Sequence, residues 1–314
     1  MSMTTLTLTG ARTARLGRAA DYLELTKPRI ASLVLVTVAA TMFVAGWGLP
    51  NPLLLVHTLL GTALVAASAS ALNQWLERAS DALMPRTADR PLPAGRLTAA
   101  QVNCFAAVTI VLGIVYLAAA VNLLTAGLGL LTWVSYVWIY TPLKSRTPLN
   151  TVVGAVAGAL PVLMGWAATG APLDLKAFSV FMILFLWQFP HFMAIAWIYR
   201  RQYSAAGLQM LTTVDSSGAR AGAQAVTCAL ALLPVSLLPS VLGMAGPGYV
   251  LLALLLGLGQ LACAVTFLFY RSEGSARWLL RASLVYLPAV LMLLIANPLV
   301  STVRFAIAQY GIGS

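Results

Sequence analysis

Charged residues are scarce in this chain: Asp, Glu, Lys and Arg together make up 9% of its 314 residues, and only eight residues are acidic. A soluble domain carries about 25% charged residues, because its surface has to be accepted by water. This scarcity excludes an ordinary soluble fold. Apolar residues account for 60% of the chain, so we expect most of its outer surface to face lipid.

Cysteine is rare as well, which limits the roles that thiols can have. Cys104, Cys228 and Cys263 each stand alone in a different apolar stretch. Such isolated positions exclude a disulfide framework and the paired spacing of a zinc site, so we interpret them as buried apolar filler. The first 20 residues contain no acid and no apolar core, which excludes a secretory signal. We interpret residues 1–20 as a basic flexible tail.

Long apolar stretches fill the rest of the chain, and each is near the ~20 residues that a helix needs to cross the hydrocarbon core. The predicted spans are residues 30–48, 54–75, 99–120, 123–140, 151–169, 176–198, 221–242, 248–269 and 279–297. We therefore predict an all-α, polytopic integral membrane protein, in which residues 21–314 form one nine-helix domain.

Basic residues divide unequally between the two sides of these spans. With the N-terminus inside, 17 of the 19 Lys and Arg residues fall on the inner side, and only Lys176 and Arg304 fall outside. The positive-inside rule predicts this asymmetry, and one span missed early in the chain would destroy it. The net charge of +11 therefore indicates topology. No basic segment is interleaved with an exposed aromatic surface, which argues against a nucleic acid partner.

A polar stripe marks the end of the second span. Asn73, Glu77 and Asp81 recur at intervals of four, so on a helix they lie nearly above one another. Two carboxylates placed in this way repel each other, and ionisable groups near lipid are costly. A divalent cation relieves both penalties. Hard oxygen ligands suit Mg²⁺, which takes one or two carboxylates and completes its shell with water and substrate phosphate.

Basic residues follow the stripe closely. Arg86, Arg90 and Arg96 lie in the same inner loop, and Lys144 and Arg146 lie in the next inner turn. Guanidinium groups bind phosphate oxygens through a planar fork, so these cations, following carboxylates for a metal, predict a phosphate site. The alternatives are a solvated helix end whose acids and bases pair locally and, for the second turn, ordinary anchoring at the membrane surface.

The two histidines differ in their expected position. His191 lies inside the sixth span, within residues 187–192, where a polar residue is a functional candidate. Neutral imidazole ligates iron or transfers protons; the alternative is a hydrogen bond to a neighbouring helix. His57 precedes Asn73 by 16 residues, about 24 Å along one helix, and we exclude it from an inner site.

Three runs together resemble a known family: residues 73–96, residues 140–166 (YTPLKSRTPLNTVVGAVAGALPVLMGW) and residues 187–211 (WQFPHFMAIAWIYRRQYSAAGLQML). In order and spacing they closely resemble the protoheme IX farnesyltransferases, or haem O synthases, of the intramembrane prenyltransferase superfamily. The resemblance extends from about residue 22 to the end of the ninth span. It implies nine helices around a central cavity. The implied reaction converts haem b, farnesyl diphosphate and water to haem O and diphosphate, with haem b as a substrate and Mg²⁺ as the cofactor.

The resemblance also implies roles for single residues. Asn73, Glu77 and Asp81 would hold Mg²⁺ and act in catalysis, and His191 and Gln188 would bind haem. The diphosphate would be bound by Arg78, Arg86, Arg90, Lys144 and Arg146. The implied location is the bacterial inner membrane, with the N-terminus and the active-site loops in the cytoplasm; the mitochondrial inner membrane is the second choice. Membrane lipid, haem A synthase and the assembly of a terminal oxidase are the implied partners.

The second inner loop departs from the family, in which an acid usually stands just before a tyrosine. Here Gln202 precedes Tyr203, and the nearest acid downstream is Asp215. This departure has three interpretations. Mg²⁺ is bound mainly by the first loop, which we favour; Asp215 replaces the missing acid; or this copy is impaired. In the first case Gln202 orients a metal-bound water.

Other functions fit parts of this pattern. A related prenyltransferase with a quinone-precursor or chlorophyll-type acceptor would share the fold and the first loop, but would normally carry paired acids in the second. A transporter would need only the helices, yet it would place polar groups at the midplane of several of them. Haem A synthase itself is excluded, because the two histidines of this chain cannot supply two bis-histidine haem sites.

Overall fold

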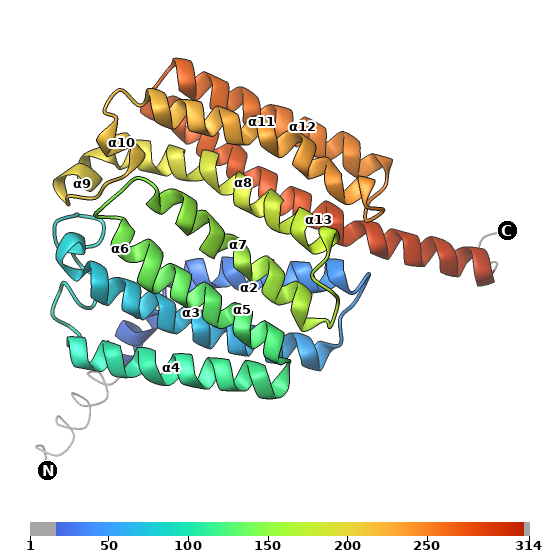
Figure 1. Cartoon of the computed structure of the whole chain (residues 1–314), viewed down its shortest axis with the longest axis horizontal. Coiled ribbons are helices and arrows are strands. Elements are labelled where there is room, and N and C mark those ends of the chain that lie inside the picture. The colour runs from blue at the N-terminus through green and yellow to red at the C-terminus, as the bar shows by residue number, and fades with distance from the viewer. Residues whose placement is uncertain (1–16, 311–314) are drawn as a thin grey trace, which may run out of the picture.

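The structure, a computed structural model, describes the backbone of residues 17–310 and the side chains of residues 17–296. Within this part of the chain it contains helices and no strands (Figure 1). The elements are α2 (Pro28–Ala45), α3 (Pro52–Asp81), α4 (Ala99–Ala120), α5 (Leu123–Val134), the π-helix η1 (Ser135–Tyr140), α6 (Thr141–Leu143), α7 (Asn150–Ala168), α8 (Leu175–Ile198), α9 (Arg200–Ala205), α10 (Leu211–Val214), α11 (Ala219–Val241), α12 (Pro247–Phe269) and α13 (Glu273–Tyr310). Residues 1–16 of the predicted tail lie outside the described residues, and its residues 17–20 belong to a short helix that ends at residue 25.

Nine helical segments among the described residues are long and apolar enough to cross a membrane, which confirms the predicted fold class. Helix α3 continues to Asp81, six residues beyond the predicted membrane span, and so carries the whole polar stripe, as the spacing of its residues predicts. The predicted start of the ninth span is wrong. The last span begins at Glu273 rather than at residue 279, because the Ser272 hydroxyl accepts a hydrogen bond from the Ser275 amide and caps the first turn.

Helix α7 lies at the centre of the bundle and is the most buried of the membrane helices. It packs against α2 and α5 on one side and α8 on the other, and Figure 1 shows it between α2–α6 and the group of α8, α11, α12 and α13. Small residues permit these close contacts. A Cβ atom at Gly165 would overlap the Val38 carbonyl of α2, and one at Gly158 would overlap the Gln188 side chain of α8.

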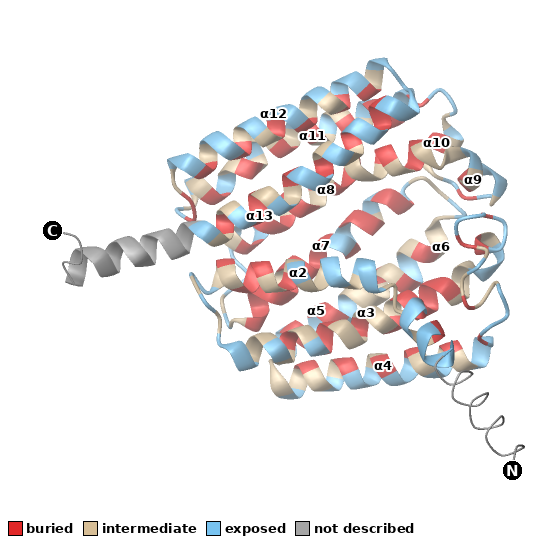
Figure 2. Ribbon diagram, turned by 180° about the vertical axis from the view of Figure 1, so that it is seen from behind, coloured by how far each residue is buried: buried red, intermediate tan, exposed pale blue. Residues whose placement is uncertain are grey.

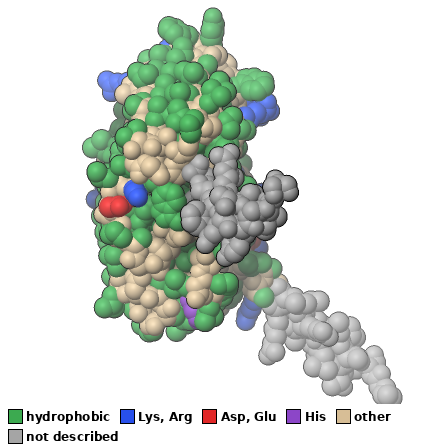
Figure 3. All heavy atoms as spheres, turned by 90° about the vertical axis from the view of Figure 1, so that its right-hand side faces the viewer, with side chains coloured by type: hydrophobic (Ala, Val, Ile, Leu, Met, Phe, Trp, Pro, Cys, Tyr) green, Lys and Arg blue, Asp and Glu red, His purple; other side chains and the backbone are tan. Residues whose placement is uncertain are grey.

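The outer surface is apolar, as a surface that faces lipid must be. Hydrophobic side chains cover much of the face shown in Figure 3, and Figure 2 shows exposed residues along the outward sides of the helices. The prediction of buried cysteines is wrong: Cys104 is exposed on α4, and Cys228 and Cys263 are half-buried. Lipid accepts a thiol as readily as a protein core does, so an apolar stretch does not tell which side a cysteine faces.

The long loops lie together at one end of the bundle, at the left of Figure 1, which we call the loop end. It comprises the connection from α3 to α4, the turn from α6 to α7 and the segment from α8 to α11. Hydrogen bonds join the last two: the Gln209 amide donates to the Lys144 carbonyl at 2.7 Å, and the Asn150 side chain donates to the Gln209 carbonyl at 2.9 Å. Residues far apart in the sequence are thereby held in one region.

Candidate functional site

The polar stripe occupies the last turns of α3 at the loop end. Asn73, Glu77 and Asp81 are all helical, as their spacing predicts. Asn73 and Asp81 are buried, with 0% and 1% of their surface exposed, and the Glu77 side chain is 13% exposed. A buried carboxylate needs a charged or hydrogen-bonding partner, so the surrounding elements must supply cations.

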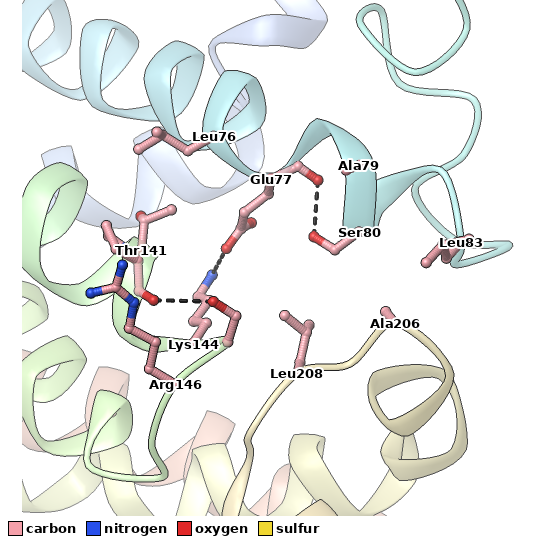
Figure 4. Close-up of a pocket in the computed structure, with 12 residues that line it drawn as sticks. Leu76, Glu77, Ala79, Ser80, Leu83, Thr141, Lys144, Arg146, Ala206 and Leu208 are labelled. Carbon is pink, nitrogen blue, oxygen red and sulfur yellow. Dashed lines mark hydrogen bonds and ion pairs between the residues drawn. The ribbon is translucent and has the colours of Figure 1, made fainter.

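Each member of the stripe has a cation of its own. The Lys27 ammonium donates to Asn73 Oδ1 at 2.5 Å. Glu77 Oε1 lies 2.7 Å from Lys144 Nζ (Figure 4), and Asp81 Oδ2 lies 2.6 Å from Arg90 Nη1. Three segments of the chain therefore bring positive charge to one helix end. We call these six residues the charge cluster.

The backbone before Lys144 places its side chain next to Glu77 of the polar stripe. The π-helix η1 inserts a wider turn before α6, and the Thr141 hydroxyl donates to the Tyr136 carbonyl five residues earlier at 2.8 Å. Asn73 Nδ2 donates to the same hydroxyl at 3.1 Å, which fixes α6 against α3. Lys144 Nζ also lies 4.5 Å from the centre of the Tyr140 ring, a cation–π contact. π-Helical turns of this kind are frequent at functional sites.

Lys27 is a member of the charge cluster that the sequence-based prediction missed. It precedes Pro28 and has a positive φ of 51°, which is uncommon for a residue other than glycine and costs backbone energy. Burial, and next the positive charge of Arg90, lower its pKa to about 7. Its only sequence signal was a basic residue directly before the first span, which anchoring at the membrane explained equally well.

The pKa of Lys144 is shifted in the opposite direction. Burial by itself would lower its pKa, but the adjacent negative charge of Glu77 raises the pKa well above the ordinary value. Lys144 is therefore a permanent cation beside the stripe, whereas Lys27 can lose its proton near neutral pH.

A cavity of about 410 Å³ opens beside this cluster. Its lining includes Glu77, Thr141, Lys144, Arg146 and Leu208 (Figure 4). Glu77, Lys144 and Arg146 are thus the predicted site residues that face it. The cavity combines carboxylate, ammonium, guanidinium and aliphatic groups, which suits a ligand with an anionic head and an apolar remainder.

Two other predicted phosphate ligands have different partners. Arg78 donates to the Trp75 carbonyl and lies over the Trp75 ring, and Arg86 lies 4.8 Å from the centre of the Tyr199 ring. Both are exposed at the loop end. Arg96, which the sequence also offered, pairs with Asp21 and Glu24 of the helix before α2. These three arginines lie outside the charge cluster.

Comparison with known proteins identifies the family. A model of the UbiA prenyltransferase family matches residues 33–287. The chain belongs to this family. Relatives from Solibacter usitatus and Myxococcus xanthus, each named protoheme IX farnesyltransferase, are 46% and 44% identical to it, over 87% and 86% of this chain and 98% and 91% of their own. A solved UbiA homologue from Archaeoglobus fulgidus, bound to DMAPP and Mg²⁺, is 19% identical with a TM-score of 0.65, covering 89% of this chain and 98% of its own.

The predicted superfamily is therefore confirmed, and the protein is an integral membrane prenyltransferase. Its metal ligands can be tested against the structure. Among the described residues no three His, Cys, Asp or Glu side chains converge on one point. Mg²⁺ does not require such a cage, because it is usually held by one or two carboxylates together with water and substrate phosphate. The amide and two carboxylates of the stripe fit this requirement.

In the second loop, Gln202 and Tyr203 lie on the short helix α9. Gln202 Oε1 on α9 is buried and has no hydrogen-bond partner among the described residues. The neighbouring Tyr203 is buried against Met84 of the first loop. Asp215 caps the start of α11, accepting from Ser217 and from the Arg220 amide at 2.8 Å, and these hydrogen bonds lower its pKa. The carboxylate thus has a structural role already.

The two residues predicted to bind haem, His191 and Gln188, lie on α8. Gln188 is buried, and its amide donates to the Ala155 carbonyl of α7 at 2.9 Å and to the Leu184 carbonyl, so it fastens α8 to α7. His191 Nδ1 lies 2.9 Å from the Ser283 hydroxyl of α13, and its ring stacks on Trp187. His57 is bonded to Tyr116, outside the charge cluster.

Proposed function

We propose that this membrane prenyltransferase transfers the farnesyl group of farnesyl diphosphate to a vinyl group of haem b, producing haem O and diphosphate. The observation that carries the proposal is the similarity, over most of the chain, to relatives named protoheme IX farnesyltransferase. The site supports it. Carboxylates and cations are gathered at the end of an apolar helix bundle, where a diphosphate head and an isoprenoid tail would each find suitable surroundings.

In our proposal the charge cluster binds the diphosphate group of the substrate. In our proposal Asn73, Glu77 and Asp81 hold Mg²⁺, which when bound offsets the negative charge that builds on the leaving diphosphate. Arg90 and Lys144, which pair with the carboxylates, would supply positive charge to the phosphate oxygens. Arg146, at the edge of the cavity, adds a further cation. Charge organised in advance in this way is usually the largest catalytic contribution.

In our proposal the apolar part of the bundle surrounds the reacting carbon. Cleavage of the bond between C1 and the diphosphate oxygen leaves positive charge on the allylic group, and the π electrons of the haem vinyl group form the new carbon–carbon bond. Water then adds to the neighbouring vinyl carbon and releases a proton, which leaves a hydroxyethylfarnesyl side chain. The apolar middle parts of the helices would exclude other water from the allylic cation.

Residues outside the charge cluster have supporting roles in this proposal. His191 binds the haem iron or orients the porphyrin, with Gln188 supporting α8 from the α7 side. Gln202 would orient a water held by the metal, since its buried oxygen has no hydrogen-bond partner among the described residues. Tyr203 holds the second loop against the first. Asp215 keeps its capping role, so the first loop provides the carboxylates for the metal.

The proposal also includes a location. The loop end belongs to the predicted inner side, which holds 17 of the 19 Lys and Arg residues, and the positive-inside rule would place it in the cytoplasm of a bacterial cell. Haem b and farnesyl diphosphate then reach the site from the cytoplasm or the membrane. The farnesylated haem would pass to haem A synthase or to the assembly of a terminal oxidase.

The test uses membranes that contain this chain, incubated with haem b, farnesyl diphosphate and Mg²⁺. Mass spectrometry of the extracted haem should show a gain of one farnesyl group and one water. The gain should disappear with a chelator and with Asp81→Asn. Asp89→Asn changes an exposed acid of the same loop and should leave the product unchanged.

A second acceptor in the same assay separates this function from its nearest alternative. If haem b gives no product while a quinone precursor or a chlorophyll-type ring is prenylated, the protein is a prenyltransferase with another acceptor. If neither is prenylated but Gln202→Glu restores turnover with haem b, the copy is impaired in its second loop.

A further inference from the structure

The side chain of His191 is held by one residue of another helix. Ser283 lies on α13 and is fully buried. Its hydroxyl is 2.9 Å from His191 Nδ1, and its backbone carbonyl accepts a hydrogen bond from the indole of Trp187 at 2.7 Å. Trp187 in turn stacks on the His191 ring, with the ring centres 4.9 Å apart and the planes at 25°. Ser283 of α13 therefore contacts both His191 and Trp187 of α8.

The hydrogen bonds of Ser283 determine which nitrogen of His191 carries the proton. A serine hydroxyl has one proton to donate and lone pairs to accept with. The Ser283 hydroxyl donates to the Leu280 carbonyl at 2.7 Å, so toward His191 it can only accept. His191 Nδ1 must then be the donor. In a neutral imidazole the proton on Nδ1 leaves the lone pair on Nε2.

The Nε2 atom is available to a ligand. It has no hydrogen bond within the described part of the chain, so its lone pair is unused there. The surrounding helix is apolar, and the ring cannot turn without losing both the stacking on Trp187 and the bond to Ser283. An oriented imidazole with one free lone pair has the form in which histidine binds a transition metal.

We propose that Ser283 is a positioning residue that holds His191 as the Nδ1–H tautomer and directs Nε2 to the iron of the haem acceptor. This inference rests on the proposed function, since it needs haem as the substrate. Ligating histidines commonly donate their second ring N–H to an oxygen, and loss of that partner typically weakens metal affinity by about 10–100-fold. Ser283 supplies this oxygen from a helix distant in the sequence.

The first experiment reads the tautomer directly, without haem and without turnover. The chain has two histidines, so ¹⁵N-histidine labelling in lipid nanodiscs gives two ring systems, and His57→Gln assigns them. We expect His191 to show a protonated Nδ1 and an unprotonated Nε2. The Nε2–H tautomer in the otherwise unchanged protein would overturn the inference, whatever the activity.

The second experiment measures ferric haem b binding by its absorption spectrum. Ser283→Ala should weaken haem binding by about 10–100-fold and change the spectrum of the bound iron, while Ser283→Thr, which keeps the hydroxyl, should restore both. Ser179→Ala is the matched control, because Ser179 is a buried serine of α8 whose hydroxyl also donates to the carbonyl three residues before it. It should bind haem as the unchanged protein does.

Binding of farnesyl diphosphate with Mg²⁺, which does not depend on the haem iron, shows that each variant is folded. A folded Ser283→Ala protein with an unchanged haem spectrum and affinity would overturn the positioning role alone. If the unchanged protein neither binds nor farnesylates haem b, the proposed function fails and this inference fails with it.

Discussion

Replacement of Lys144 by methionine would separate the structural role of the charge cluster from its catalytic role. The Lys144 and Glu77 side chains are 14% and 13% exposed, and their charged atoms lie 2.7 Å apart. Removal of one partner leaves a buried carboxylate unpaired, which typically costs about 3–5 kcal/mol. Without Mg²⁺ and substrate, we therefore expect Lys144→Met to unfold at a clearly lower temperature or denaturant concentration in detergent.

Turnover should fall for a different reason. Lys144 is one of the groups that would meet the leaving diphosphate, and loss of one such group typically lowers kcat by about 100–1,000-fold. The double variant Glu77→Gln/Lys144→Met removes both charges, so its stability should return toward that of the unchanged protein while its turnover stays low. Arg146→Met is the control, because this exposed neighbour forms no ion pair with the residues that the structure describes, and its loss should not lower stability. A double variant as unstable as the single one would refute the reasoning.

Three further predictions concern other positions. Burial lowers the pKa of Lys27 to about 7, so its positive charge is present below that pH and lost as pH rises through it. The charge cluster then has one cation fewer for the diphosphate, and the KM for farnesyl diphosphate should increase above pH 7. Lys27→Arg, which keeps the charge, should flatten that profile. Gln202→Glu should lower the Mg²⁺ concentration needed for half-maximal activity; no change in a Mg²⁺ titration would mean that the second loop does not reach the metal. Gly158→Ala should lower the unfolding temperature, because its Cβ would overlap Gln188, whereas Gly127→Ala, which meets no atom within 4 Å, should not.

The sequence was sufficient for the membrane fold, because hydrophobicity and helix length are properties of one segment at a time. The spacing of Asn73, Glu77 and Asp81 likewise predicted a polar stripe on one helix. The burial of that stripe was not predicted. Its turns are polar, and partners from other segments, such as Arg90 and Lys144, make it favourable for them to be buried.

Contacts between distant segments were beyond reach of the sequence. Lys27 and Asn73 are separated by 46 residues, and no pattern in either segment identifies the other. The π-helix that turns Thr141 toward Asn73 has no periodic signal either. For His191 the sequence left two interpretations, a ligand or a partner of a neighbouring helix. The structure shows the bond to a neighbouring helix, and that bond leaves the other nitrogen free.

The bond between α8 and α13 also bears on how the protein is made. His191 precedes Ser283 by 92 residues, so a ribosome that has already delivered α8 to the membrane has three more membrane helices, α11, α12 and α13, to synthesise. Until α13 inserts beside α8, the His191 imidazole lacks its hydrogen bond to the Ser283 hydroxyl. The Trp187 indole likewise lacks its hydrogen bond to the Ser283 carbonyl. Under the proposed function, a nascent chain would therefore have a poorly defined acceptor site, and haem binding would begin only when the ninth membrane helix is in place.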